Sequence, residues 1–368
     1  ETLIGSLAAI YKLKGQFGKV STSFGKPILL DEILHHNNLN WQQESSELNK
    51  KPQWYLDSVN QLSRKIMQNI NHACVLNPVN LIATILLATP RQSIDQKELI
   101  EQAGFYTQLI RNISQLKSII VAEKLTLEQL DRIKKQGLIH YREHSLGDII
   151  YLNPNDSVLM SYYRNNSLHA FIIPSLIACC FINARQMSKE KLTSIVHYVY
   201  PFLKAELHLE WSISELDYFI ENILKELIAQ NVLFQTKQCI KRPDRSDHNY
   251  LQLIRLAQIV QPILERHYMT FIILWQSESV GISEKQLEER CHLIAQKISM
   301  IYGINSPDFF DRKLFSQFIK TLFELGYIQT NEHKNLHFTP SFTNVNLDIR
   351  ALLSIEVRSS ILQILTVH

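Results

Sequence analysis

The stretch that decides the fold is "LEQLDRIKKQGLIHYREHSLGDIIYLNP", residues 127–154. Apolar residues at helical spacing run up to a glycine, and two short apolar runs follow, separated by a polar turn and closed by a proline. Glycine commonly ends a helix, and proline cannot donate to a β ladder. The stretch therefore predicts a helix followed by a β-hairpin.

The same order recurs twice further along the chain. It is found in "ENILKELIAQNVLFQTKQCIKRP", residues 221–243, where asparagine stands at the break, and in "FIKTLFELGYIQTNEHKNLHFTP", residues 318–340. A helix followed by a hairpin is the tail of a winged-helix unit. We therefore predict three such units and a mainly α (α+β) fold.

Winged helices often bind DNA, so this function has to be weighed against a structural one. A DNA-binding unit needs basic residues gathered on its recognition helix and wing. The helices before the three hairpins also carry acids, namely Glu128, Asp131, Glu221, Glu226 and Glu324. The pattern favours a structural or interaction role over nucleic-acid binding, and the net charge of +3 is too small to change this.

The composition is that of a folded helical protein. Of the 368 residues, 45% are hydrophobic and 20% are charged, which is typical of globular chains with a buried core. Ten glycines are few, and this favours helix over turn-rich β structure. No apolar run reaches the roughly 18 to 20 residues that cross a bilayer. The nearest candidate, "FIIPSLIACCFI" at residues 171–182, contains a proline and predicts a buried core helix.

Helix starts can be placed from capping signals. A serine, threonine or aspartate with a glutamine, glutamate or aspartate three residues later predicts a helix start. This pattern occurs at Ser58, Asp95, Thr126, Ser214 and Ser283. Ser306 followed by Pro307 predicts one more start, because proline suits the first helical position.

The first thirty residues differ from the rest of the chain. Val20, Thr22 and Phe24 alternate with serines, and this period of two predicts a β-strand that ends before Pro27. Nothing before this segment is typical of the rest of a sheet. The predicted strand therefore lacks partners within this chain.

The same segment is basic. One acid, Glu1, stands against four lysines, Lys12, Lys14, Lys19 and Lys26. Such a surface suits anionic lipid headgroups, a phosphorylated substrate or an acidic carrier protein. It can equally be a solvated basic face.

Motifs for common reactions are incomplete. "GKVSTSFGKP" is spaced too widely for a phosphate-binding loop, and no G-x-S-x-G is present. The five cysteines lack metal-ligand spacing, which indicates a reducing environment. His333 and His337 fall in a predicted hairpin, where the two side chains do not converge, so no metal site is predicted. Lys204 and Glu206, in "YPFLKAELHLEW", are interpreted as charges beside an apolar helix.

The densest polar cluster lies in "SYYRNNSLHAFIIPS", residues 161–175. Its arginine offers two parallel donors and its asparagines offer more, a combination that can hold a phosphate or carboxylate. The alternative is a satisfied polar corner that locks a helix to its neighbour. The candidates for a substrate or domain contact are Tyr163, Arg164, Asn165 and Asn166.

Several segments together resemble the large bacterial membrane-associated glycerol-3-phosphate acyltransferases. They are "FGKVSTSFGKPILL", "NLIATILLATPRQS", "GDIIYL", "VLMSYYRNNSLHAFIIPSLIA", "YPFLKAELHL" and "YGINSPDFFDRKLFSQFIKTLFELGYI". The similar segments follow in the same order over nearly the whole chain. They correspond only to the C-terminal part of the proteins of that family.

The resemblance implies acyl transfer from acyl-CoA or acyl carrier protein to the sn-1 hydroxyl of glycerol 3-phosphate, giving lysophosphatidic acid. It implies no metal or organic cofactor. In the family, the histidine of an H-x-x-x-x-D motif removes the hydroxyl proton as general base, and the aspartate orients it. The implied location is the cytoplasmic face of the inner membrane, peripheral or monotopic, in the CDP-diacylglycerol route of phospholipid biosynthesis.

The catalytic motif is missing from this sequence, because none of the fourteen histidines has aspartate five positions later. We therefore assign no catalytic residue here, expect that motif upstream of Glu1, and expect the chain alone to be inactive. Residues 1–36 are then interpreted as the C-terminal edge of the acyltransferase α/β domain, with the strand at 20–24 as its last strand.

The rest of the chain divides into three further parts. Residues 37–57 are the predicted linker, 58–160 a helical region ending in a β-hairpin, and 161–368 a C-terminal helical region with two helix-plus-hairpin units. The alternative function is a helical scaffold or interaction module without catalysis of its own, which would dock the upstream catalytic domain. A winged-helix nucleic-acid binder is the remaining alternative.

Overall fold

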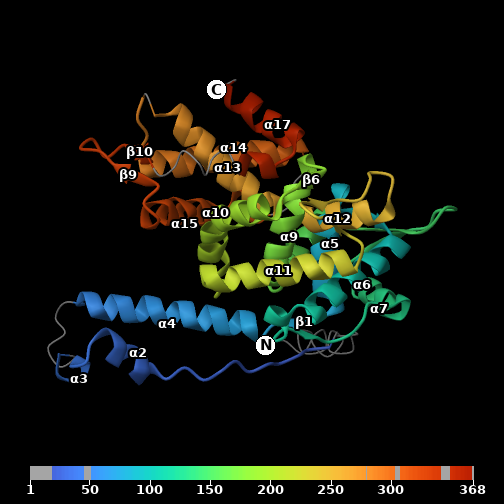
Figure 1. Ribbon diagram of the computed structural model, residues 1–368, viewed down its shortest axis with the longest axis horizontal. Coiled ribbons are helices and arrows are strands. Elements are labelled where there is room, and N and C mark those ends of the chain that lie inside the picture. The colour runs from blue at the N-terminus through green and yellow to red at the C-terminus, as the bar shows by residue number, and fades with distance from the viewer. Residues whose placement is uncertain (1–18, 45–50, 279, 303–306, 341–348, 367–368) are drawn as a thin grey trace, which may run out of the picture.

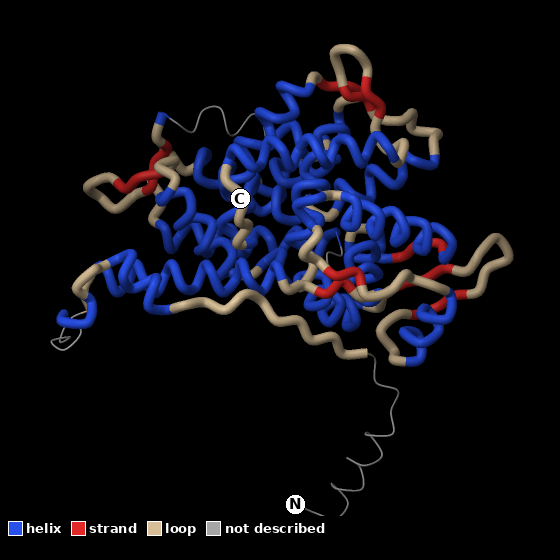
Figure 2. Tube along the Cα trace, turned by 60° about the horizontal axis from the view of Figure 1, so that its bottom comes forward, coloured by secondary structure: helices blue, strands red, loops and turns tan. Residues whose placement is uncertain are grey.

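Helices dominate the structure, a computed structural model that describes residues 19–44, 51–278, 280–302, 307–340 and 349–366 (Figure 1). The prediction of a mainly α (α+β) fold is confirmed. Figure 2 shows small hairpins at the periphery of a helical body.

The α-helices are α2 (Leu30–Asn37), α3 (Trp41–Glu44), α4 (Gln53–His72), α5 (Pro78–Leu87), α6 (Gln96–Asn112), α7 (Leu127–Lys135), α8 (Pro154–Asn165), α9 (Leu168–Asn183), α10 (Lys189–Leu207), α11 (Ile213–Ala229), α12 (His248–Gln258), α13 (Gln261–Gln276), α14 (Glu284–Tyr302), α15 (Arg312–Glu324) and α17 (Ile355–Thr366). The 3₁₀ helices are η2 (Pro90–Gln92), η3 (Ser114–Leu116) and η4 (Pro307–Phe310). The strands are β1 (Val75–Leu76), β2 (Ser93–Asp95), β3 (Ile120–Val121), β4 (His140–Arg142), β5 (Ile149–Tyr151), β6 (Gln186–Met187), β7 (Phe234–Gln235), β8 (Ile240–Lys241), β9 (Ile328–Thr330) and β10 (Leu336–Phe338).

The three predicted helix-plus-hairpin units are confirmed. Each unit also contains further elements that precede its last helix and hairpin. The first unit contains β2, α6, α7, β4 and β5, and its sheet has the order β2-β5-β4. The second contains β6, α10, α11, β7 and β8, and its sheet has the equivalent order β6-β8-β7. In both sheets the first strand pairs antiparallel with the last one.

The third unit contains α14, α15, β9 and β10. At the place of the first strand of the other two units, it has a single backbone hydrogen bond. The Leu336 N–H donates to the Ile282 carbonyl over 2.8 Å, just before α14 begins. The three units therefore share one topology in tandem. At the tip of the first hairpin Leu146 is 89% exposed, so this wing projects into solvent.

The break that ends the last helix of each unit has the same backbone geometry. Gly137, Asn231 and Gly326 all have a positive φ, between +57° and +74°. After each one, the next residue's N–H returns to a carbonyl five residues back, as Tyr327 does to Leu322 over 2.9 Å. This is the left-handed cap that turns a helix sharply into a following strand.

Two glycine substitutions should have opposite effects. Gly326 has φ +72° with open space around an added Cβ, so Gly326→Ala should lower the free energy of unfolding by about 1–2 kcal/mol through backbone strain alone. Gly104 lies within α6, also with open space, and Gly104→Ala should raise it by about 0.5–1 kcal/mol. Urea denaturation of both variants checks this; equal effects would rule out the strain explanation.

Three of the five helix starts predicted from capping signals are confirmed. Asp95, Thr126 and Ser283 accept hydrogen bonds from the first turns of α6, α7 and α14, as predicted. The starts at Ser58 and Ser214 are wrong. Ser58 lies inside α4 and donates to the Trp54 carbonyl, while the cap of α11 is Ser212, two residues earlier than predicted.

The predicted start at Ser306-Pro307 falls partly outside the described residues. From Pro307 the chain forms the short 3₁₀ helix η4. The predicted domain division stays a prediction, although the boundary at 160/161 falls within α8, and the predicted linker contains α3 and the start of α4.

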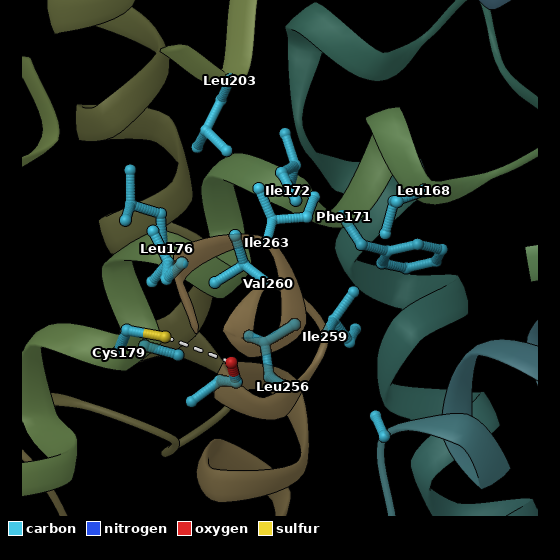
Figure 3. Packing of buried hydrophobic residues seen from close by; sticks show 14 of the residues in the cluster. Leu168, Phe171, Ile172, Leu176, Cys179, Leu203, Leu256, Ile259, Val260 and Ile263 are labelled. Atoms are coloured by element: carbon cyan, nitrogen blue, oxygen red, sulfur yellow. Dashed lines mark hydrogen bonds between the residues drawn. The ribbon is translucent and has the colours of Figure 1, made fainter. Parts of the chain in front are cut away.

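The prediction of a buried core helix at residues 171–182 is confirmed. Every residue of α9 from Leu168 to Phe181 is buried, and α12 packs along it (Figure 3). Ser175 Oγ and Cys179 Sγ both donate to the Ala257 carbonyl, over 3.2 and 3.1 Å. These polar groups are therefore satisfied inside an otherwise apolar centre.

No single described helix has the length and apolar character needed to span a membrane. The pair α8 and α9 reaches them only together, and the two helices bend by 92° where they meet.

The predicted strand at residues 20–24 is wrong. Residues 19–29 form a loop, and Val20 and Phe24 are 92% and 91% exposed. An alternating pattern makes a strand only where a neighbouring strand can pair with it, and no strand among the described residues pairs with this segment. The loop instead runs along α4, where Asn69 Nδ2 donates to the Lys26 carbonyl over 2.8 Å.

Candidate functional site

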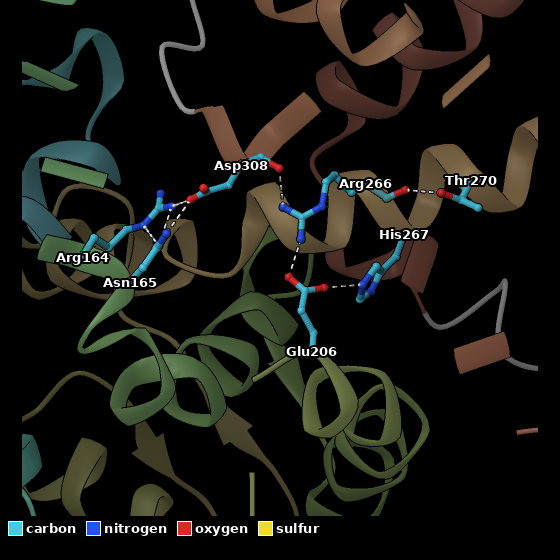
Figure 4. A network of polar contacts seen from close by, with 7 residues as sticks. All are labelled: Arg164, Asn165, Glu206, Arg266, His267, Thr270 and Asp308. Carbon is cyan, nitrogen blue, oxygen red and sulfur yellow. Dashed lines mark hydrogen bonds and ion pairs between the residues drawn. The ribbon is translucent and has the colours of Figure 1, made fainter. Parts of the chain in front are cut away.

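Two segments that carry the family resemblance meet in space, through Arg164 of "SYYRNN" and Asp308 of "SPDFFD". Arg164, near the end of α8, places its Nη2 2.6 Å from Oδ2 of Asp308 in η4 (Figure 4). Asn165 Nδ2 donates to the same oxygen over 2.9 Å. The Arg164 side chain is only 9% exposed, so this ion pair is largely withdrawn from water.

Local structure fixes Arg164 at a corner. Helix α8 begins with Pro154 at its first position and ends where the chain bends by 92° into α9. At that bend Ser167 Oγ donates to the Arg164 carbonyl over 3.1 Å. The guanidinium therefore leaves α8 at the point where the chain enters the buried core helix.

The other two predicted site residues, Tyr163 and Asn166, accept hydrogen bonds through their backbone carbonyls. The Tyr163 carbonyl accepts a hydrogen bond from Asn80 Nδ2 over 2.8 Å, and the Asn166 carbonyl accepts one from Cys74 Sγ over 3.4 Å. The structure thus brings Arg164 and Asn165 together on Asp308. Their role in a substrate or domain contact stays a prediction.

A second buried centre adjoins the first. Glu206, near the end of α10, pairs with Arg266 Nη2, and its Oε2 lies 3.2 Å from His267 Nε2. Arg266 Nη1 also donates to the Asp308 carbonyl over 3.2 Å, so one guanidinium joins both centres (Figure 4). The network ties α8, α10, α13 and η4 together.

Electrostatics at Glu206 favour the charged form. Burial alone would raise the pKa of this carboxyl group, but Arg266 and His267 outweigh burial and hold the pKa at about 2. Burial lowers the pKa of His267, although Glu206 opposes this. His267 is therefore neutral near pH 7, and its ring stacks on Phe318 with centroids 3.9 Å apart.

A neutral histidine beside a carboxylate has the chemistry of a general base, but this one has no access to a substrate. A general base must come within hydrogen-bond reach of the proton that it removes. The His267 side chain is 1% exposed and Glu206 is 12% exposed. The geometry therefore supports a structural role for this pair.

The interpretation of Glu206 as a charge beside an apolar helix is wrong, and the roles of Arg266 and His267 were missed. The available signal was the position of Arg266 and His267 within the apolar sequence of α13, because a charge inside an apolar run must be paired when buried. The partner could not be identified from the sequence, because Glu206 lies 60 residues away.

A small open cavity lies beside the end of α4. Its lining includes Glu210, Trp211 and the three histidines His72, His169 and His208. Within the described ranges, no group of three or more histidine, cysteine, aspartate or glutamate side chains is arranged to hold a metal ion. His333 and His337 lie in the turn and second strand of the third hairpin, as predicted.

His169 makes stability depend on pH. Its Nε2 lies 3.0 Å from the Asn71 carbonyl oxygen, and burial lowers its pKa from 6.5 to about 4. Between pH 6.5 and pH 4 the His169 ring is protonated in the unfolded chain but stays neutral in the folded chain. The free energy of unfolding therefore decreases as pH falls from 6.5 toward 4. The loss should reach about 2 kcal/mol by about pH 5.

The variant His169→Gln tests this pH effect. Glutamine keeps a donor near the Asn71 carbonyl but does not titrate. Urea denaturation at about pH 7 and about pH 5 should show that the variant loses about 2 kcal/mol less than the unmodified chain. Equal losses in the two proteins would mean that His169 is not the group responsible.

The fold is that of a helical region that contains three winged-helix-like units, and a buried ion-pair network joins its helices. Residues 1–331 match the family model described as "Glycerol-3-phosphate acyltransferase C-terminal region". The chain belongs to this family, and the resemblance seen in its motifs is confirmed.

Curated relatives carry the name glycerol-3-phosphate acyltransferase. One from Pseudomonas savastanoi pv. phaseolicola is 33% identical over 365 residues, which are 99% of this chain and 44% of the relative. One from Pseudomonas aeruginosa (strain PAO1) is 34% identical over 338 residues, which are 92% of this chain and 40% of the relative. The chain thus spans less than half the length of these relatives.

Proposed function

We propose that this chain is the C-terminal part of a glycerol-3-phosphate 1-O-acyltransferase. The complete protein would transfer an acyl chain from acyl-CoA or acyl carrier protein to the sn-1 hydroxyl of glycerol 3-phosphate, giving lysophosphatidic acid. The observation that carries the proposal is family membership over residues 1–331. No metal or organic cofactor is part of the proposal.

The proposed reaction needs a general base that this chain does not supply. No histidine in the sequence has aspartate five positions later, and the buried His267–Glu206 pair is closed to a substrate. We place the H-x-x-x-x-D motif in the part of the family protein that this chain does not contain. In this proposal the three units support a catalytic domain.

The proposed location is the cytoplasmic face of the inner membrane, with peripheral or monotopic attachment. Its support is the basic leading segment, in which Lys26 is exposed and Lys19, also exposed, pairs with Glu123. Lys12 and Lys14 lie outside the described residues. Cations near a surface of anionic lipids gain roughly 1 kcal/mol each, so this segment would contribute to attachment without anchoring the protein alone.

An acyl-transfer assay with radiolabelled glycerol 3-phosphate tests the proposal. The isolated chain should give no product above background, and a complete family protein that ends in this chain should give lysophosphatidic acid. Turnover by the isolated chain would contradict the missing-base argument. No turnover by the complete protein would contradict the activity itself.

A scaffold or interaction module is the second candidate function. The buried network favours it, because Arg164 and Glu206 are both used in contacts between helices. Co-purification of this chain with the separately expressed remainder of the family protein would support it. Nucleic-acid binding is not part of either proposal, and steeply salt-dependent binding to duplex DNA would contradict both.

A further inference from the structure

Helix α4 is an exposed element with an apolar face. It has 20 residues, of which Ser58 alone is buried. Figure 1 shows α2 alongside it, and α2 is the element with which α4 makes its main contacts. Contacts to α10 come from the far end, where Asn71 Nδ2 donates to the Leu207 carbonyl over 2.9 Å.

The exposed apolar residues of α4 lie on one face. Leu56, Val59, Ile66 and Ile70 are between 42% and 58% exposed. At about 100° per residue, these four positions fall within an arc of about 80° around the helix. Soluble proteins seldom leave such a continuous apolar surface uncovered without a binding role.

The helix and loop that flank α4 occupy a different side. Gln61 accepts a hydrogen bond from Asn37 of α2 over 2.7 Å, and Asn69 donates to the Lys26 carbonyl. By the same angular count, Gln61 and Asn69 lie about 100° or more from the centre of the apolar arc. Neither α2 nor the leading loop therefore covers this face.

The charge pattern of α4 suits a protein partner better than a lipid surface. Its only Asp, Glu, Lys or Arg residues are Asp57, Arg64 and Lys65, and all three lie on the side away from the apolar arc. A helix that lies in a membrane interface usually carries many lysines and arginines on its polar face. Depletion of charge around an apolar centre is typical of the core of a protein–protein interface.

We propose that the part of the family protein outside the matched region packs on this face of α4. This inference rests on the proposed function, because it takes that part to be the catalytic domain. The curated relatives are more than twice as long as the region that this chain covers, and the family model is a C-terminal region. The unmatched part therefore precedes this region, on the side of the sequence where α4 and its leading loop lie.

Photo-cross-linking in the complete protein tests the contact. p-Benzoylphenylalanine replaces Ile66 in one sample and Leu251 of α12 in a matched control; the two side chains are 42% and 41% exposed. The complete family protein, bound to vesicles of anionic phospholipid, is irradiated, digested and analysed by mass spectrometry. The probe at position 66 should give at least tenfold more cross-links to peptides from the unmatched part than the probe at position 251.

Each other result would overturn the inference. Cross-links from position 66 mainly to lipid would make the α4 face a membrane contact. Cross-links between two copies of the chain, seen as a covalent dimer, would make it a self-association surface. Equal yields from the two positions would show no specific partner. Acyl transfer is measured separately, so an inactive protein that still cross-links contradicts only the proposed function.

Discussion

Replacing Glu206 by glutamine is expected to lower the free energy of unfolding by about 3–5 kcal/mol. The substitution keeps the shape of the side chain and removes its charge. Arg266, whose side chain is 5% exposed, then remains charged without its carboxylate, and His267 loses an ionic hydrogen-bond partner. A buried charge left without a partner is among the most costly changes that a single substitution can make.

Two further variants separate this effect from a general loss of charge. Asp244 pairs with Arg185 at the surface, where both side chains are about 70% exposed, so Asp244→Asn should change stability by less than about 1 kcal/mol. The double variant Glu206→Gln/Arg266→Met should recover most of the loss, because no unpaired charge remains. Urea denaturation measures all three. A loss below about 1 kcal/mol for Glu206→Gln would show that the pair is not effectively buried.

Replacing Arg164 by alanine is expected to cost about 2–4 kcal/mol of stability. The variant loses the ion pair to Asp308 and the packing of a guanidinium that is nine-tenths buried. The expected loss is smaller than for Glu206, because Asp308 is 29% exposed and can regain water. In the complete enzyme we expect KM for glycerol 3-phosphate to stay unchanged while the melting temperature falls.

Kinetics and stability together decide the role of Arg164. Steady-state assays give KM, and thermal unfolding of the same samples gives Tm. A large rise in KM with an unchanged Tm would show that Arg164 contacts the substrate. The variant Arg164→Lys should recover part of the stability, because it restores one charge but not the two-pronged donor.

Local signals were enough to predict the three units. The turn after each last helix depends on one residue that tolerates a positive φ, and Gly137, Asn231 and Gly326 stand there in the sequence. Capping by Asp95 or Thr126 is equally local, since donor and acceptor lie within three residues. Such features follow from backbone sterics and short hydrogen bonds, so they can be recognised without knowledge of the tertiary fold.

Features that need distant partners could not be predicted in this way. Val20 and Phe24 have the alternation of a strand, but this pattern does not reveal that the segment, without a partner strand in the described chain, lies as a loop along α4. Arg164 could be identified as a candidate, whereas its partner Asp308 is 144 residues away. The burial of the guanidinium against Asp308 could be seen only in three dimensions, and a substrate contact by Arg164 stays a prediction.

The projecting wing of the first unit has a practical consequence. The tip of the β4–β5 hairpin around Leu146 stands clear of the helical body, and extra residues in an exposed turn cost little loop-closure entropy. A fluorescent reporter or affinity epitope inserted there would leave the core, the ion pairs and α4 untouched. It would give a handle for following this region within the longer protein.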